Sequence, residues 1–381
     1  MLNNPIDALA EVEELDFGGG FDSSLQVRAW PSRLRSMKFG VFSFFNQPVS
    51  GVSWPASLQQ LWFGYRFNQP IEGVTWPTSL QKLTFSMSFD RAIEKVVWPG
   101  SLQELRLGQS FNQPIEKVEW PGSLQVLHFG RRFNQLIEKV QWTKSLLRLT
   151  MGDGFNKPIE DVAWPNALEC LSFGEAFNQP VEGAAWPTSL RVLAFGMDFD
   201  QPIEGVAWPR SLQQLALGQH FNRPIRGVKW PTCLEKLDLG MDFNQPIDGV
   251  MWPDSLEQLR FPRSFNQPID DITWPRSLVQ LAFGNRFDHS IEGVRWPSSL
   301  RRLSFQGWFC QSLQKLGTAA PTLERFRLRL SSGPTGCRYD LLRGIDWPPG
   351  LLHLTVGTNA SLNGVSIPSS VSVSYSDFGD F

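Results

Sequence analysis

The sequence predicts a mainly β, single-domain solenoid of parallel short strands, with about 15 turns of 22 residues and little or no helix. Tryptophan recurs at a constant spacing of 22 residues from Trp54 to Trp296. Each unit, such as residues 67–88, keeps Phe at position 1, Trp at position 10 and Leu at positions 14 and 17. Pro recurs at positions 4 and 11 and Gly at positions 7 and 20. These breakers leave no interval long enough for an ordinary helix, so the units must be stabilised by stacking.

Two apolar pairs predict the extended parts of each unit. Leu83 is separated from Phe85 by one residue, and Val74 is separated from Trp76 in the same way. Because alternate side chains of a strand point to the same face, this spacing indicates a strand with one buried face. We therefore expect two short extended segments per unit.

The segment at positions 1–5, Phe-Asn-Gln-Pro-Ile in many copies, predicts a tight turn. Its second residue is Asn68 in one unit and Asp90 in the next. Both side chain types bond to nearby backbone groups in turns, so a ladder of such turns is expected. Cation binding by the Asp-bearing copies is the alternative.

The tryptophan at position 10 shares strand parity with the apolar residue at position 8, as Trp76 does with Val74. This parity favours packing in the core. The alternative is a platform of exposed tryptophans that stack on carbohydrate. Tryptophan fluorescence distinguishes the two, because exposed indoles emit at longer wavelength and are easily quenched.

The array divides the chain into three parts. Residues 1–20 are expected to form an N-terminal cap, residues 21–308 the regular repeats, and residues 309–381 degenerate repeats with a C-terminal cap. The first unit has 24 residues because of extra residues near Phe42 to Phe44, which should bulge as a loop. The N-terminus does not resemble a signal peptide, and no segment is long and apolar enough to cross a membrane, so a cytoplasmic protein is expected.

The recurring Phe-Asn-Gln-Pro-Ile followed by Trp-Pro-x-Ser-Leu-x-x-Leu-x-Phe-Gly resembles the FNIP repeat, a relative of the leucine-rich repeat. Ile-Pro-Ser-Ser-Val at residues 367–371 is similar to the BspA type of leucine-rich repeat. The resemblance implies a curved solenoid used in protein–protein interaction, coupled in some relatives to an F-box or another partner domain. Trp at position 10 departs from the family pattern, where a smaller aliphatic residue is more usual.

The sequence contains no catalytic constellation. Its four histidines are several turns apart, and no phosphate-binding glycine loop, Ser-His-Asp arrangement or Cys-x-x-Cys motif is present. We therefore predict a non-enzymatic protein with no catalytic residues, no cofactor and no metal site. The four cysteines, Cys170, Cys233, Cys310 and Cys337, are expected to be reduced thiols.

Position 6 is acidic in ten of the twelve units from Phe45 to Phe287, which places like charges in one row. We interpret this row as a solvated edge, with docking of a basic partner or cations as the alternative. Its members are Glu72, Glu94, Glu116, Glu138, Glu160, Glu182, Glu204, Asp248, Asp270 and Glu292.

A binding face is best sought at outward positions where the copies differ, chiefly positions 16, 18, 21 and 22. Trp62, Tyr65 and Arg66 form one group that combines aromatic residues with arginine, as favoured at interaction hot spots. A basic patch is expected from cations within three adjacent turns, with random drift on a solvated surface as the alternative; its members are Arg106, His128, Arg131, Arg132 and Arg148. The candidate partner-binding residues are Trp62, Tyr65, Arg66, Arg106, His128, Arg131, Arg132, Arg148, Asp238 and Arg260.

The predicted function is a protein–protein interaction scaffold with a variable strand face and an acidic edge. The formal net charge of −2 favours neither nucleic acid nor an anionic membrane as partner, so the expected partner is another protein, bound by a monomer. One alternative is an extracellular adhesin-like or carbohydrate-binding solenoid. Another is a repeat array without a dedicated ligand.

Overall fold

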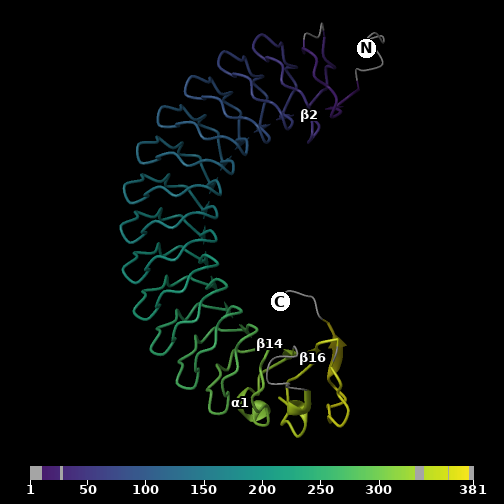
Figure 1. Ribbon diagram of the computed structural model, residues 1–381, viewed down its shortest axis with the longest axis vertical. Helices are drawn as coiled ribbons and strands as arrows, with labels where there is room; N and C mark the ends of the chain where they lie inside the picture. Colours follow the sequence, from purple (N-terminus) through teal and green to yellow (C-terminus); the bar gives the residue numbers. More distant parts are fainter. Residues whose placement is uncertain (1–10, 26–28, 331–338, 359, 377–381) are drawn as a thin grey trace. The chain divides into compact units, whose positions relative to one another are not determined.

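The computed structural model describes residues 11–25, 29–330, 339–358 and 360–376. By their contacts these residues form two compact units, unit 1 up to Leu190 and unit 2 from Arg191. In each unit the chain coils through successive turns that each contribute one short strand (Figure 1). The predicted parallel β solenoid is confirmed.

The strands have three to six residues, and consecutive strands within a unit pair in parallel at equivalent repeat positions. Unit 1 contains β1 (Glu14–Phe17), β2 (Ser36–Phe39), β3 (Gln60–Trp62), β4 (Lys82–Thr84), β5 (Glu104–Arg106), β6 (Val126–His128), β7 (Arg148–Thr150) and β8 (Cys170–Ser172). Unit 2 contains β9 (Val192–Ala194), β10 (Gln214–Ala216), β11 (Lys236–Asp238), β12 (Gln258–Arg260), β13 (Gln280–Phe283), β14 (Arg302–Gly307), β15 (Arg325–Leu330), β16 (His353–Val356) and β17 (Ser372–Tyr375). Helix in the described residues is limited to α1 (Leu316–Ala319) and the 3-10 turn η2 (Tyr339–Leu342).

The core consists of seven apolar rows, at positions 1, 5, 8, 10, 14, 17 and 19, that run through the turns. The leucines at positions 14 and 17 and the phenylalanine at position 1 are almost fully buried, as Leu80, Leu83 and Phe67 illustrate. The tryptophans also pack inward, because Trp76, Trp98, Trp164, Trp186, Trp208, Trp230, Trp252 and Trp274 are only 6–8% exposed. Core packing of these tryptophans is confirmed.

The predicted second strand of each turn is absent. Residues 74–76, which contain Val74 and Trp76, form no strand, and the equivalent described residues of the other repeats do not either. The stacking distance of the indoles explains the difference: the ring centroids of Trp142 and Trp164 are 6.4 Å apart. A parallel ladder needs neighbouring backbones about 4.8 Å apart, so bulky rings hold the turns too far apart on this side.

Adjacent turns are also closer together beside the strands than on the side away from the strands. At position 19, next to the strand, the rings of Phe63 and Phe85 are 5.3 Å apart. At position 1, the rings of Phe67 and Phe89 are 6.2 Å apart. The distance between turns therefore increases away from the strands, and within each unit the strands line the narrower side.

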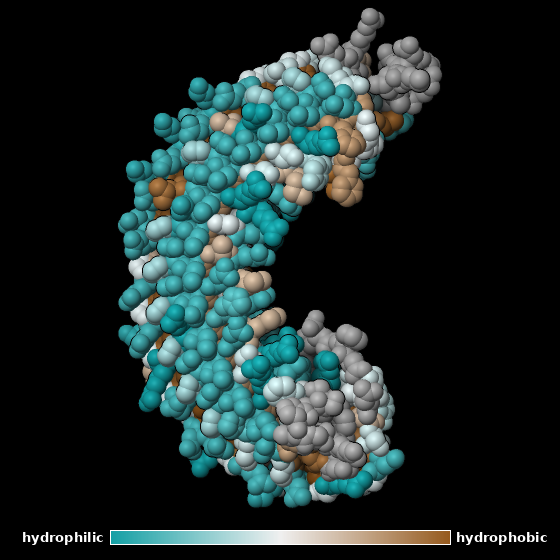
Figure 2. Space-filling view, viewed as in Figure 1, coloured by the Kyte–Doolittle hydropathy of each residue, from teal (hydrophilic) through white to brown (hydrophobic). Residues whose placement is uncertain are grey.

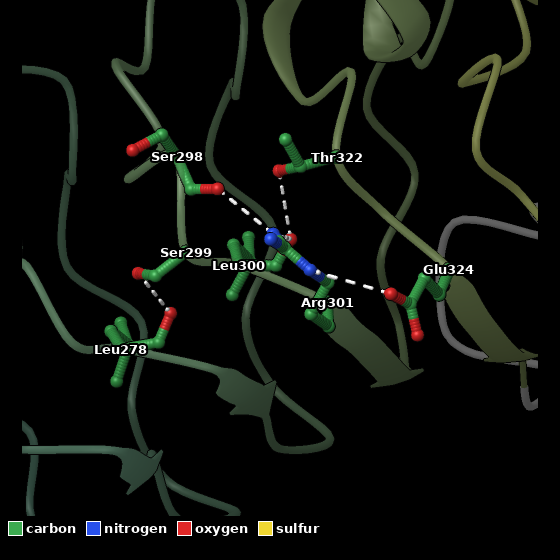
Figure 3. Close-up of polar contacts among 7 residues, drawn as sticks. All are labelled: Leu278, Ser298, Ser299, Leu300, Arg301, Thr322 and Glu324. Atoms are coloured by element: carbon green, nitrogen blue, oxygen red, sulfur yellow. Dashed lines mark hydrogen bonds and ion pairs between the residues drawn. The ribbon is translucent and has the colours of Figure 1, made fainter.

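Two polar ladders join the turns. The side chain of Asn112 accepts hydrogen bonds from the backbone N–H of Asn134 (2.9 Å) and from Nε2 of Gln135 (3.0 Å) in the next turn. A ladder of these polar side chains is present, but the predicted tight turn at positions 1–5 is wrong: residues 67–71 form no turn, and the turns lie on either side, at residues 65–66 and 72–73. The serine at position 13 donates to the leucine carbonyl of the preceding turn, as in the 2.8 Å bond from Ser299 to Leu278, and Thr322 continues this ladder into the degenerate repeats (Figure 3).

Glycine occupies position 20 in nine of the twelve units, where neighbouring turns approach closely. A Cβ atom on Gly130 would lie 1.7 Å from the carbonyl oxygen of Gly108, which no rotamer relieves. At Gly240 the backbone φ of +79° adds a second reason, because side chain-bearing residues rarely adopt it. The glycine of the Leu-x-Phe-Gly motif therefore follows the strand at the point where the chain passes close to the preceding turn.

The acidic row at position 6 is solvated, as predicted. Glu72, Glu138 and Asp248 are exposed, whereas Glu94 and Glu116 are half-buried. The remaining members of the row, Glu160, Glu182, Glu204, Asp270 and Glu292, are exposed.

The prediction of four reduced thiols is wrong at one position. Cys310 is disulfide-bonded, whereas Cys170 and Cys233 are free, and Cys337 lies outside the described residues.

Candidate functional site

The two extra residues of the first full turn form a bulge that presents apolar side chains to solvent. Ser43 anchors it: its backbone N–H donates to the carbonyl of Gly40 (2.7 Å), and its buried hydroxyl accepts from the backbone N–H of Phe45 (3.1 Å). Phe42 and Phe44 flank this anchor and are 78% and 48% exposed. A fixed backbone therefore holds two phenylalanines at the surface.

Cations from the same and the neighbouring turn lie against aromatic rings. The guanidinium of Arg66 lies 4.3 Å from the ring centroid of Phe44, and Nζ of Lys38 on β2 lies 4.7 Å from that of Trp62 on β3. Such contacts hold long side chains in place while leaving their charge available to a partner. We call Lys38, Phe42, Phe44, Trp62, Tyr65 and Arg66 the aromatic–cation cluster.

The sequence predicted Trp62, Tyr65 and Arg66 as one group, and the structure places them at the end of β3 and in the turn that follows it. It did not predict Phe42, Phe44 or Lys38 as binding residues. The signal was present, because the only 24-residue unit of the regular array carries two exposed phenylalanines in its insertion. Phe42 and Phe44 belong to an insertion and have no counterpart in the other repeats, so a position-by-position comparison of the repeats does not reveal them.

The predicted basic patch is partly neutralised. Nε of Arg106 lies 2.7 Å from Oε1 of Glu104, and Nε of Arg131 lies 3.3 Å from Oδ2 of Asp153. Arg132 and Arg148 have no ion pair with a described residue. Two of the four arginines are therefore already paired within the chain.

His128 lies beside Arg106 in the β5–β6 ladder. Burial lowers the pKa of His128, and the neighbouring charge of Arg106 lowers it further. The imidazole is thus neutral at neutral pH and adds no charge to the patch.

Asp238 and Arg260 are neighbours in the β11–β12 ladder of unit 2 and line a shallow groove of about 250 Å³ on the strand face. Oδ1 of Asp238 accepts a 3.0 Å hydrogen bond from the backbone N–H of Gly240, which ties this carboxylate to its own turn. Arg260 and Lys236 are exposed and have no ion pair with a described residue. The groove therefore presents two available cations above a floor that includes Ala194 and Ala216.

Charge is segregated around the turn. Outward residues of the strands are often cationic, including Lys82, Arg148 and Lys236, whereas the carboxylates gather at position 6. The space-filling view is mostly hydrophilic, with apolar colour over the first turns of unit 1 (Figure 2). The described residues hold no cluster of three or more side chains suited to a metal ion, and none of their helices is long and apolar enough to span a membrane.

One strand per turn, leucines that point inward and outward positions that vary define a repeat solenoid of the leucine-rich-repeat class. A model of the FNIP repeat matches residues 67–110, 111–154, 155–198, 177–220, 221–264 and 243–286, which together make up more than half of the chain. The chain belongs to the FNIP repeat family.

Solved structures agree with this class. The chain is similar to CroV588, described as a novel circular LRR protein, with 31% identity and a TM-score of 0.82 over 97% of this chain. It spans 57% of the length of CroV588. A TLR13–ssRNA13 complex matches 97% of this chain and 55% of that chain at 13% identity and a TM-score of 0.59, which shows likeness of fold alone. None of the curated proteins compared matches the chain.

Proposed function

We propose that this protein is a non-enzymatic scaffold that binds a protein partner on its strand face, with the aromatic–cation cluster as the main contact. The observation that supports this most strongly is the 78% exposure of Phe42 on a bulge that the other repeats lack. Exposed aromatic residues beside Arg are favoured at interaction hot spots. The unpaired strand-face cations of both units favour a partner with an acidic surface.

The test is quantitative affinity capture with the full chain and matched variants. Phe42→Ser with Arg66→Glu removes an aromatic contact and reverses a charge in the cluster. Val97→Ser is the control, because Val97 is 82% exposed at position 9, away from the strand face. We expect specific partners to be lost from the double variant and retained by the control. Identical partner lists for all three proteins would refute the proposal and favour an array without a dedicated ligand.

A carbohydrate-binding function is the second candidate. It is favoured by the exposed rings of Phe42, Phe44 and Tyr65, since sugars stack on aromatic faces, and by the disulfide at Cys310, since disulfides persist in oxidising compartments. The same variants, tested on an array of immobilised glycans, separate the two candidates. Retention of glycans by the parent chain and loss on Phe42→Ser would support carbohydrate binding over a protein partner.

A further inference from the structure

The strand face of β14, β15 and β16 holds a concentration of arginines that the repeat pattern does not require. Arg302 on β14 pairs in register with Arg325 on β15, and Arg327 lies two residues further along the same face. Like charges directly opposite each other on adjacent strands are destabilising. A bound anion would therefore stabilise this stacked pair of arginines.

The described residues do not supply that anion. The sequences of β14 to β17 contain no carboxylate, and neither Arg302 nor Arg325 has an ion pair with a described residue. The nearest acidic residue in sequence, Glu324, is engaged by Arg301, whose Nε lies 3.4 Å from Oε1 of Glu324 (Figure 3). On β5 of unit 1, by contrast, Glu104 pairs with both Arg106 and Lys82.

Hydrogen-bonding groups complete a pocket of about 280 Å³ around the arginines. His353 follows Arg325 in the ladder, Thr355 follows Arg327, and Ser374 follows Thr355. The hydroxyls of Thr355 and Ser374 are 3.0 Å apart, and Nδ1 of His353 is hydrogen-bonded to the hydroxyl of Ser372. We call Arg302, Arg325, Arg327, His353, Thr355 and Ser374 the C-terminal basic pocket.

A second observation concerns a neighbouring polar group. Ser304 pairs in register with Arg327, and its side chain is fully buried. Its hydroxyl has no hydrogen-bond partner in the part of the chain that the structure describes. A buried hydroxyl without a partner is uncommon, and an oxygen of a ligand or a water molecule would satisfy it.

We propose that the C-terminal basic pocket binds a phosphorylated serine or threonine side chain of a partner protein. A phosphomonoester carries a charge of about −1.5 to −2 and three acceptor oxygens, which suits the two stacked guanidinium groups of Arg302 and Arg325. A single carboxylate would satisfy only one bidentate arginine. A nucleic acid backbone needs a continuous track of cations, whereas here the arginines occupy only two adjacent strands.

This site is in unit 2 and does not depend on the aromatic–cation cluster, so the two proposals succeed or fail separately. The test uses the full chain and a fluorescently labelled peptide of uncharged residues around one phosphoserine, measured by anisotropy. Serine and glutamate versions of the peptide are compared under the same salt conditions. The variants are Arg302→Gln and Arg325→Gln, with Arg295→Gln as the charge-matched control at position 9.

We expect the phosphoserine peptide to bind at least about tenfold more tightly than the serine or glutamate peptide. Each pocket variant should weaken this binding roughly tenfold or more, while Arg295→Gln leaves it unchanged. Equal binding of the three peptides, or full binding by both pocket variants, would overturn the proposal. Tighter binding of single-stranded RNA, lost on Arg302→Gln, would assign the pocket to nucleic acid instead. Displacement by equimolar inorganic phosphate would assign it to a small anion.

Discussion

Replacement of Asn112 by alanine tests whether the asparagine ladder holds adjacent turns together. The Asn112 side chain accepts two hydrogen bonds from the next turn, from Asn134 N–H at 2.9 Å and Gln135 Nε2 at 3.0 Å. A typical net contribution is about 0.5–1.5 kcal/mol per hydrogen bond, so the loss of both should cost about 1–3 kcal/mol. The backbone N–H of Asn134 is then left without this acceptor.

Hydrogen exchange at the Asn134 amide is the appropriate measurement, because unfolding of a long repeat array need not be two-state and a global midpoint then has no single meaning. The amide should lose protection in Asn112→Ala by roughly ten- to a hundredfold, which corresponds to about 1–3 kcal/mol. Asn112→Asp is the matched control. Asp90 already performs this role for the backbone N–H of Asn112 at 2.9 Å, so the acceptor is kept.

An aspartate of the same row has a predictable pH dependence. Asp22 occupies the equivalent position of an earlier turn, and the hydrogen bond from the backbone N–H of Asn46 lowers its pKa. The stabilisation from this contact should be complete above the unfolded pKa of about 3.9 and be lost as the pH falls through the lower folded value. Unchanged protection in Asn112→Ala, or equal loss in both variants, would refute the ladder's contribution.

Three further results are expected. Gly130→Ala should weaken hydrogen-exchange protection in its own and the preceding turn by an amount that corresponds to about 1–3 kcal/mol, because its Cβ would collide with the Gly108 carbonyl, whereas Gly122→Ala, with no atom near its Cβ, should not. The hydrogen bond to Asp242 raises the pKa of His220, so Asp242→Asn should lower it in an NMR titration. The stabilisation from that contact is complete below the unfolded pKa and is lost as the pH rises through the folded value. Tryptophan emission should be blue-shifted and resistant to quenching, since most of the interior indoles are buried; a red-shifted, easily quenched signal would contradict the core described above.

The repeat pattern was sufficient to predict the fold, because each shared position has one physical task. Leu83 fills the core beneath its strand, and Phe67 stacks on its equivalents in the adjacent turns. The pattern did not predict correctly whether the segment around Trp76 forms a strand. Alternation of apolar residues indicates only which side chains are buried. Whether two backbones can hydrogen-bond depends on their separation, and that is set by the bulk of the stacked rings.

The candidate site was less predictable, for a related reason. Tyr65 and Arg66 occupy regular positions and could be compared with the other copies. Phe42 and Phe44 belong to an insertion, and Arg325 and Arg327 lie where the spacing becomes irregular. In an insertion or an irregular repeat, the path of the preceding turn determines which side chains face outward and which residues pair between strands. That path is seen only in the three-dimensional structure.

The 24-residue turn has a consequence for how such an array can acquire new properties. Although it has two extra residues, Met37 on β2 still pairs with Leu61 on β3, and Phe39 still stacks on Phe63 at 5.7 Å. Extra chain at this edge leaves both the hydrogen-bonded and the aromatic rows continuous. The edge that follows each strand is therefore a natural graft point, where loops of different length and chemistry can be exchanged while the rest of the module stays the same.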